Sequence, residues 1–162
     1  MARRHSGWYQ GVYIVENKEK YKGKQNPFCK SSWEHRFSFF LDHHPDVKKW
    51  CFECLVIPYY STIDNKMHRY ITDFCFEEVD EKDQKRRFVV EVKPESQIVP
   101  PKQPKNNNRK AQKRYIYEAT TYARNRCKWG AAEDYCKKHG YEFRIACLVK
   151  GNWKVYSLND II

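Results

Sequence analysis

The chain has 162 residues, of which 41% are hydrophobic and 16% aromatic, and it carries a formal net charge of +11 at pH 7. That length suits one compact domain, and the apolar content excludes a disordered chain. The positive charge favours an acidic partner, of which nucleic acid is the commonest. No apolar run is long enough to cross a membrane, and residues 1–10 lack the apolar core of a signal peptide, so we expect no membrane partner.

The first thirty residues are basic and aromatic and show no clear periodicity. We therefore divide the chain into a basic N-terminal arm, residues 1–30, and a domain, residues 31–162. Two interpretations of the arm stay open at this point. It is either a segment that lies loosely on the domain or on DNA, or a disordered terminus.

A helix is predicted from Ser31 to His44, because apolar side chains recur there at helical spacing and Pro45 follows. Glu34 lies three residues after Ser31, and this capping-box pattern predicts that its carboxylate accepts the Ser31 amide. Glu34 also lies about 100° from Trp33 around the helix, at the edge of the buried stripe. The same side chain is therefore a candidate to face a site beside a sheet.

Two strands joined by a charged loop form the centre of the predicted fold. The first covers residues 69–77 and the second residues 86–93, and the polar loop between them suits a hairpin. Side chains alternate between the faces of a strand, so Glu91 and Lys93 point to one face. The opposite face of the second strand carries the apolar side chains, which are Phe88, Val90 and Val92.

Asp73, Glu91 and Lys93 are the chemically informative residues of this hairpin. Carboxylates and an ammonium on a buried-looking face are costly unless they have partners or a metal. Two carboxylates are suitable ligands for a hard cation such as Mg²⁺, which together with a lysine would activate water against a phosphodiester. The Asp…Glu-x-Lys pattern resembles the PD-(D/E)xK nuclease motif. A cross-strand salt bridge on a half-exposed sheet is the structural alternative.

Seven cysteines are present, and we expect them to be mostly reduced and buried as small hydrophobic residues. Cys51 and Cys54 form a Cys-x2-Cys pair inside a predicted strand, residues 50–60. Residues three apart on a strand point to opposite faces, and no second such pair follows. The sequence therefore does not predict a structural zinc site.

A proline- and asparagine-rich loop, residues 94–108, follows the hairpin, and a loop this long is usually functional or disordered. Helices are predicted over residues 109–126, with Asn108 as N-cap, and 131–139, followed by a strand over 141–149. Residues 153–162 form a short tail, which is a candidate for one further strand. Four basic residues crowd the start of the first helix, where a phosphate would compensate the unfavourable charge at the helix N-terminus, although a solvated face is the commoner arrangement. These residues are our candidates for holding the DNA backbone, and they are Arg109, Lys110, Lys113 and Arg114.

The predicted order is that of an α/β protein with a central mixed sheet. A set of short motifs also runs from Lys20 to about Leu148. They are Lys20-Tyr21-Lys22-Gly23, Ser31-Ser32-Trp33-Glu34, Phe37, Leu41-Asp42, Trp50, Glu53, Ile57-Pro58-Tyr59, Arg69-Tyr70, Asp73-Phe74, Glu91-Val92-Lys93-Pro94, Lys128-Trp129, Ala131-Ala132 and Tyr141-Glu142-Phe143-Arg144. With the αβββαβ order, these motifs resemble the head-completion nucleases of contractile-tailed bacteriophages, which are related to the TnsA endonuclease subunit of transposons.

This resemblance implies a restriction-endonuclease-like αβββαβ core with a central mixed sheet flanked by helices. It implies a metal-dependent DNA endonuclease that acts on phage DNA during head completion, after packaging. Mg²⁺ is the expected cofactor, with Mn²⁺ as an alternative. The expected partners are DNA and phage capsid or neck proteins, and the expected locations are the virion and, during assembly, the host cytoplasm.

The family's residues fall on positions of this sequence that match its motif. The resemblance assigns catalytic roles to Glu34, Asp73, Glu91 and Lys93, with the metal held by Asp73, Glu91, the Val92 carbonyl and Glu34. The motif's proline before the aspartate is replaced by Thr72, which is not a ligand position. Two alternatives remain: a DNA-end-binding structural virion protein that kept the fold and lost the cutting, and a small capsid or adaptor protein with an incidental salt bridge.

Overall fold

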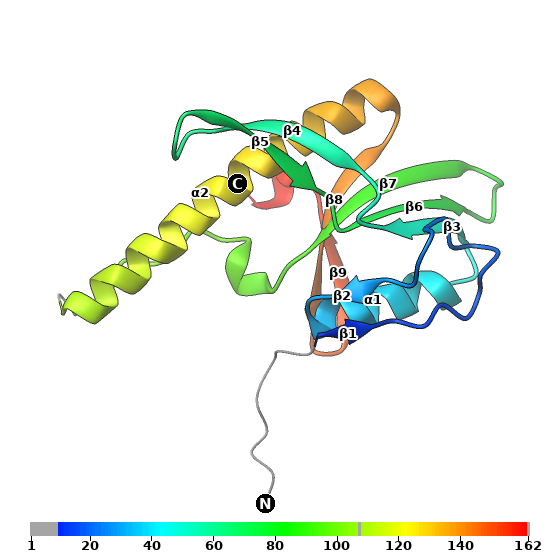
Figure 1. Cartoon of the computed structure of the whole chain (residues 1–162), viewed down its shortest axis with the longest axis horizontal. Coiled ribbons are helices and arrows are strands. Elements are labelled where there is room, and N and C mark those ends of the chain that lie inside the picture. The colour runs from blue at the N-terminus through cyan, green and yellow to red at the C-terminus, as the bar shows by residue number, and fades with distance from the viewer. Residues whose placement is uncertain (1–9, 107, 162) are drawn as a thin grey trace, which may run out of the picture.

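The computed structural model describes residues 10–106 and 108–161 (Figure 1). A five-stranded sheet in the order β3-β6-β7-β8-β9 forms the centre, and two-stranded sheets, β1-β2 and β4-β5, lie beside it. The helices are α1 (Ser32–His43) and α2 (Arg109–His139). The strands are β1 (Gly11–Val12), β2 (Phe28–Cys29), β3 (Val47–Phe52), β4 (Val56–Ser61), β5 (Lys66–Ile71), β6 (Phe74–Val79), β7 (Lys85–Val92), β8 (Glu142–Val149) and β9 (Asn152–Tyr156).

The central sheet is mixed, as the sequence predicts. β6 and β7 form an antiparallel hairpin, whereas β7 and β8 are parallel neighbours. A parallel pair needs a long crossover connection, and the loop after β7 together with α2 supplies it. The two helices lie on opposite faces of the sheet (Figure 1), so both faces of its inner strands are covered.

Each face of the sheet has its own hydrophobic core. Phe37 and Leu41 of α1 pack with Phe88, Val90 and Val92 of β7, which confirms the alternation predicted for that strand. Val89, which points the other way, packs with Trp129 of α2 in the second core. Glu91 therefore lies on the α2 face, and it is only 3% exposed.

The predicted strand over residues 50–60 is wrong, because it is two strands in two sheets. β3 ends at Phe52, and Glu53 adopts a left-handed backbone with φ 49°, which turns the chain. β4 then pairs with β5 and packs against α2 rather than joining the central sheet. The strand predicted over residues 69–77 is likewise divided, into β5 and β6, at Thr72-Asp73.

The two predicted helices after the long loop form one continuous helix, α2. Asn108 is its N-cap, and the Asn108 Oδ1 accepts the amide of Ala111 at 2.8 Å. Gly140, with φ 71°, ends it as predicted. Gly130 interrupts the sequence pattern but not the helix, because the burial of Trp129 and Ala132 against the sheet outweighs the weak helix propensity of one glycine.

Part of the segment expected to be an arm packs into the domain. Tyr13, Val15 and Cys29 are buried in the core beneath α1, and the Tyr13 hydroxyl donates to Asp42 at 2.9 Å. The arm's first residues, 1–9, lie outside the described residues, so its basic Arg3 and Arg4 are not placed. The division of the chain at residue 30 stays a prediction. Within the described part of the chain, neither helix has the length and apolarity to cross a membrane.

Candidate active site

The break between β5 and β6 positions Asp73 against the end of β7. Thr72 anchors the break, because its amide donates to the Leu55 carbonyl at 3.0 Å. A proline, which the family motif has at this position, could not make that bond. The amide of Val92, at the end of β7, donates to Asp73 Oδ2 at 2.8 Å, so the carboxylate just before β6 is fixed on the backbone of β7. Asp73 and Glu91 are thereby brought to one place.

Glu91 has a partner on each carboxylate oxygen. The Tyr70 hydroxyl donates a short hydrogen bond to Oε2, and the Lys93 ammonium lies 2.8 Å from Oε1. Tyr70 and Glu91 are almost fully buried, whereas the Lys93 side chain is 24% exposed. The predicted placement of Glu91 and Lys93 on one face is confirmed. The ion pair joins two residues of the same segment and is not the cross-strand surface bridge that the sequence left open.

The charges of this cluster shift the pKa values of its members. Burial and then the neighbouring Glu91 raise the pKa of Asp73 well above its usual range. Burial disfavours the ammonium of Lys93, but Glu91 and Asp73 more than offset that effect and raise its pKa. Burial and Glu91 also raise the pKa of Tyr70, so its hydroxyl stays protonated and able to donate. Asp73 and Glu91 thus share one directly paired ammonium, that of Lys93, an arrangement that favours an additional cation.

Glu34 lies at the start of α1, near the cluster. Its amide donates to Ser31 Oγ at 3.2 Å, as the capping box predicts, but its carboxylate accepts the Lys30 amide at 2.7 Å rather than that of Ser31. The charge of Glu34 contributes to the raised pKa values of Asp73 and Lys93. Lys30 also contacts Glu53 at 2.6 Å, so a second acidic side chain stands at this edge of the site.

Two residues of the site were not singled out as functional from the sequence. Tyr70 is one, and it had appeared only in a predicted strand and, with Arg69, among the motifs of the family resemblance. Lys128 of α2 is the other: its ammonium lies 5.5 Å from the centre of the Tyr70 ring. Burial lowers the pKa of Lys128, and the nearby Glu91 opposes this shift while Lys93 and Arg124 reinforce it. Lys128-Trp129 had appeared only as part of the family resemblance, because its distance along the chain hides its contact with β5.

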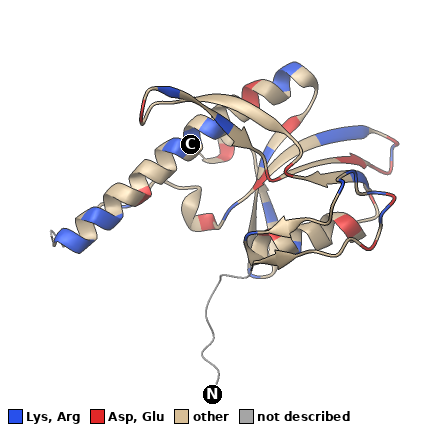
Figure 2. Ribbon diagram, in the orientation of Figure 1, with Lys and Arg blue, Asp and Glu red and all other residues tan. Residues whose placement is uncertain are grey.

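The four predicted DNA-binding residues lie elsewhere. Arg109, Lys110, Lys113 and Arg114 are exposed on the first turns of α2. This part of the helix projects beyond the sheet, and its outer end is basic (Figure 2). Nineteen residues separate Arg109 from Lys128, which at 1.5 Å per residue is about 28 Å along the helix axis. The structure therefore does not bring the basic cluster and the carboxylates together. The helix α2 instead connects the basic cluster with Lys128, which lies at the carboxylate site.

Comparisons with known proteins identify the family of the chain. Residues 44–147 match the family described as TnsA-like endonuclease N terminal, a range that contains Asp73, Glu91 and Lys93. The chain belongs to this family. It is also 33% identical, over 138 residues, to the head completion nuclease of Enterobacteria phage T4, a match that covers 85% of this chain and 89% of that protein. No solved structure matches the chain.

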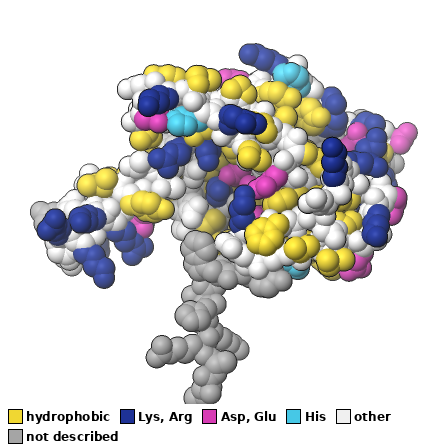
Figure 3. All heavy atoms as spheres, viewed as in Figure 1, with side chains coloured by type: hydrophobic (Ala, Val, Ile, Leu, Met, Phe, Trp, Pro, Cys, Tyr) yellow, Lys and Arg dark blue, Asp and Glu magenta, His cyan; other side chains and the backbone are white. Residues whose placement is uncertain are grey.

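The resemblance predicted from the sequence is thus confirmed, and the chain is by homology a nuclease of the phage head-completion type. Within this TnsA-like endonuclease domain, Glu91 is buried, whereas Asp73 and Lys93 are partly exposed, so the cluster reaches the surface. Figure 3 shows acidic side chains gathered at the middle of one face with basic side chains beside them. A surface of that kind can bind a cation and, with it, an anionic substrate.

Proposed function

We propose that the protein is a metal-dependent DNA endonuclease that hydrolyses phosphodiester bonds at Asp73, Glu91 and Lys93. The observation that carries the proposal is the convergence of two carboxylates and an ammonium at the junction of three strands. The raised pKa of Asp73 supports it, because a carboxylate pair that is short of positive charge is suited to a divalent cation. Perturbed groups of this kind gather at functional sites.

The residues present fit a hard cation. Asp73 uses Oδ2 for the Val92 amide and so keeps Oδ1 for a ligand role, and Glu91 contributes a second carboxylate. The Val92 carbonyl and Glu34, directly or through water, complete the proposed set. All of these donors are oxygen atoms, which Mg²⁺ and Mn²⁺ prefer. The cation would supply charge stabilisation at the scissile phosphate and a bound water of lowered pKa.

The protein's own groups have separate proposed roles. Tyr70 holds one oxygen of Glu91 and so fixes the direction in which that carboxylate faces. Lys93 neutralises Glu91 before DNA arrives and then positions the attacking water. Lys128, whose ammonium is partly buried and lies over Tyr70, is placed to bind a phosphate oxygen at the opposite side of the site. Preorganised charges of this kind are the main source of stabilisation for a phosphoryl transition state.

DNA would extend from the site along α2 to its basic outer end. About 28 Å of helix separates the two, and at 3.4 Å per base pair this corresponds to roughly 8 base pairs of duplex. Arg109, Lys110, Lys113 and Arg114 would contact phosphates there without reading sequence. Arg114 is partly committed, because it pairs with Glu118 at 2.7 Å.

The wider setting rests on the family. We propose that the five-stranded sheet and its two helices are a variant of the restriction-endonuclease-like αβββαβ core. The name of the T4 relative places that protein in head completion. We accordingly propose that the present chain acts on phage DNA after packaging, in contact with capsid or neck proteins, and resides in the virion after assembly in the host cytoplasm.

The test is cleavage of linear, circular and branched DNA by the purified protein with Mg²⁺, with Mn²⁺ or with EDTA. Cleavage that requires the cation and is lost in Glu91→Gln supports the proposal. An exposed carboxylate of α2, Asp134, provides the matched control through Asp134→Asn. Tight, salt-dependent DNA binding without cleavage under any of these conditions would instead identify a DNA-end-binding structural protein that kept the fold.

A further inference from the structure

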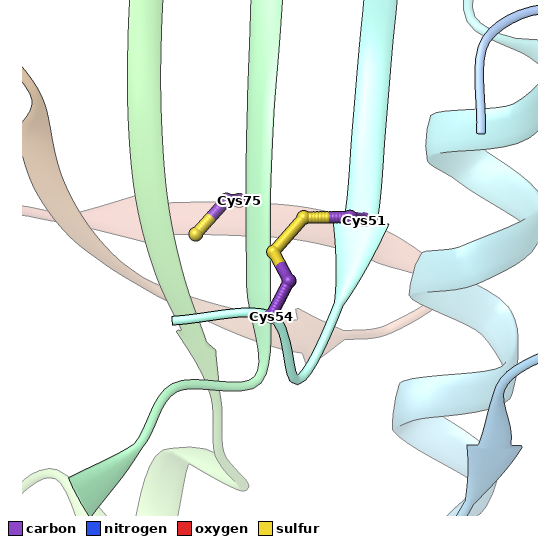
Figure 4. Close-up of side chains that lie close together, drawn as sticks. All are labelled: Cys51, Cys54 and Cys75. Atoms are coloured by element: carbon purple, nitrogen blue, oxygen red, sulfur yellow. A yellow bond between two sulfur atoms is a disulfide. The ribbon is translucent and has the colours of Figure 1, made fainter. Parts of the chain in front are cut away.

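Three cysteines that the nuclease site does not use converge on one face of the sheet. Cys51 on β3 and Cys75 on β6 are direct cross-strand partners, and Cys54 lies in the loop after β3. Their sulfur atoms all lie within 4.8 Å of one another, and Figure 4 shows the three side chains side by side. Cys51 and Cys54 are joined as a disulfide in the structure.

The expectation that Cys51 and Cys54 point to opposite faces is wrong. The expectation of mostly reduced cysteines holds for the other five, which are free, whereas these two form a disulfide. The cause of the shared face is Glu53, whose left-handed backbone ends the strand and turns Cys54 back onto the face of Cys51. A Cys-x2-Cys pair that folds around a tight turn in this way presents both sulfur atoms to one point. Cys75 then adds a third sulfur from the neighbouring strand.

We propose that, when Cys51 and Cys54 are reduced, the three cysteines bind a thiophilic divalent cation such as Zn²⁺, with water as a fourth ligand. A disulfide accounts for the approach of two of these sulfur atoms but not for the third. In a tetrahedral Zn²⁺ site each sulfur lies about 2.3 Å from the metal. The three sulfurs here already lie within 4.8 Å of one another, so reduction of the Cys51–Cys54 bond and a local shift of side chains would let all three reach one ion. Soft thiolate ligands distinguish this cation chemically from the hard one proposed for the carboxylates.

The surroundings are suited to such a site. Cys54 is exposed, and Cys51 and Cys75 are partly exposed and line a surface pocket, so an ion can enter from solvent. A divalent cation with three thiolates carries a net charge of −1. The charged side chains that line the same pocket are three basic ones and one acidic one, so their balance is positive and offsets that charge; they are Lys22, Lys49, Arg87 and Glu77.

The position of the cluster gives the cation a structural role. Cys75 lies two residues after Asp73, and the Glu53 amide beside Cys54 donates to the Asp73 carbonyl at 2.9 Å. A cation that joins the three sulfurs would tie the loop after β3 to the start of β6. We therefore expect it to stabilise the backbone that presents Asp73, as ligand binding to a folded state does.

The experiment uses the full-length protein treated with a phosphine, which reduces the disulfide to two thiols and is itself oxidised to the phosphine oxide. The reduced protein is titrated with Co²⁺, a spectroscopic substitute for Zn²⁺. We expect one equivalent to bind with a thiolate-to-cobalt charge-transfer band, which carboxylate-bound Co²⁺ does not give. Zn²⁺ should displace Co²⁺, so that the band disappears, and should raise the melting temperature of the reduced protein.

Variants decide how many sulfurs take part. Cys51→Ser, Cys54→Ser and Cys75→Ser should each lose or strongly weaken the band, whereas Cys127→Ser, a partly buried cysteine of α2, should keep it. Asp73→Asn should also keep it, which separates this site from the proposed nuclease metal. Absence of the band in fully reduced wild-type protein overturns the proposal. A band unchanged by Cys75→Ser overturns the three-sulfur site as well.

Discussion

Asp73→Asn is the most informative single substitution, because the structure predicts opposite effects on activity and stability. Asparagine keeps a side-chain oxygen that can accept the Val92 amide, now at 2.8 Å from Asp73 Oδ2, so the junction of β6 and β7 should persist. It removes the negative charge that faces Glu91. Loss of an anionic metal ligand should lower cleavage at least about 10³-fold, the upper range for deletion of one electrostatic contact at a reacting centre.

Stability of the metal-free protein should rise. A single substitution that removes an unfavourable charge commonly stabilises a protein by about 0.5–2 kcal/mol. Because Asp73 and Glu91 repel each other in a buried setting, and Lys93 and Lys128 offset only part of this, we expect the upper part of that range, about 1–2 kcal/mol. In a domain of this size each kcal/mol shifts the melting temperature by about 2–4 °C, which predicts a rise of about 2–8 °C.

The sign of the pH dependence follows from the same shift. Because the pKa of Asp73 is raised in the folded protein, the folded state binds a proton before the unfolded chain does. The stability contributed by this group is therefore fully present at or below the ordinary aspartate pKa, and it is lost as the pH rises through the raised pKa of the folded state. In Asp73→Asn this part of the pH dependence should disappear.

The assay pairs DNA cleavage with thermal melts in EDTA and in Mg²⁺, with Asp134→Asn as the control. Mg²⁺ should raise the melting temperature of the wild type and of the control but not that of Asp73→Asn. Cleavage near the wild-type rate in Asp73→Asn would refute the metal-ligand role. A lower melting temperature in EDTA would refute the argument that the carboxylate cluster is short of positive charge.

Four further changes test the site and the DNA path. Glu34→Gln should lower cleavage by at least about tenfold, because it removes a negative charge near the proposed metal. Its melting temperature should not change, because glutamine can still accept the Lys30 amide, and wild-type cleavage in this variant would leave only the capping role. Tyr70→Phe should destabilise by about 1.5–3 kcal/mol, the worth of a hydrogen bond to a charged group, and a melt indistinguishable from wild type would contradict the Tyr70–Glu91 contact. Lys128→Met should lower cleavage without destabilising the fold, since it removes a partly buried charge; unchanged turnover would exclude a phosphate-binding role. Neutralising Lys110 and Lys113 together should weaken binding to all DNA sequences and make the slope of log K against log salt concentration shallower by about two units. A double variant of Lys137 and Lys138, at the other end of α2, is the control; equal slopes in the two double variants would count against the DNA path.

Local patterns of the sequence predicted the elements whose residues meet close along the chain. The period of apolar residues and the Ser31 cap gave α1, and the alternation along β7 correctly separated Val90 from Glu91. The Asp…Glu-x-Lys spacing was enough to name Asp73, Glu91 and Lys93 as candidates, because they lie at the adjoining ends of β6 and β7, which are consecutive in sequence. Gly140 ended α2 for a purely local reason, the left-handed backbone that glycine adopts without strain.

Tertiary structure alone decided which strands share a sheet and which distant residues reach the site. Nothing local distinguishes one strand over residues 50–60 from two, because the break depends on Glu53 adopting a left-handed backbone whose amide then bonds Asp73. The same turn brings Cys54 to Cys51, against the alternation that a continuous strand would impose. Lys128 lies far along the chain from Tyr70, and only the packing of α2 against β4 and the sheet places its ammonium over that ring. Contacts of this kind depend on the summed burial of two cores, which a window of neighbouring residues does not contain.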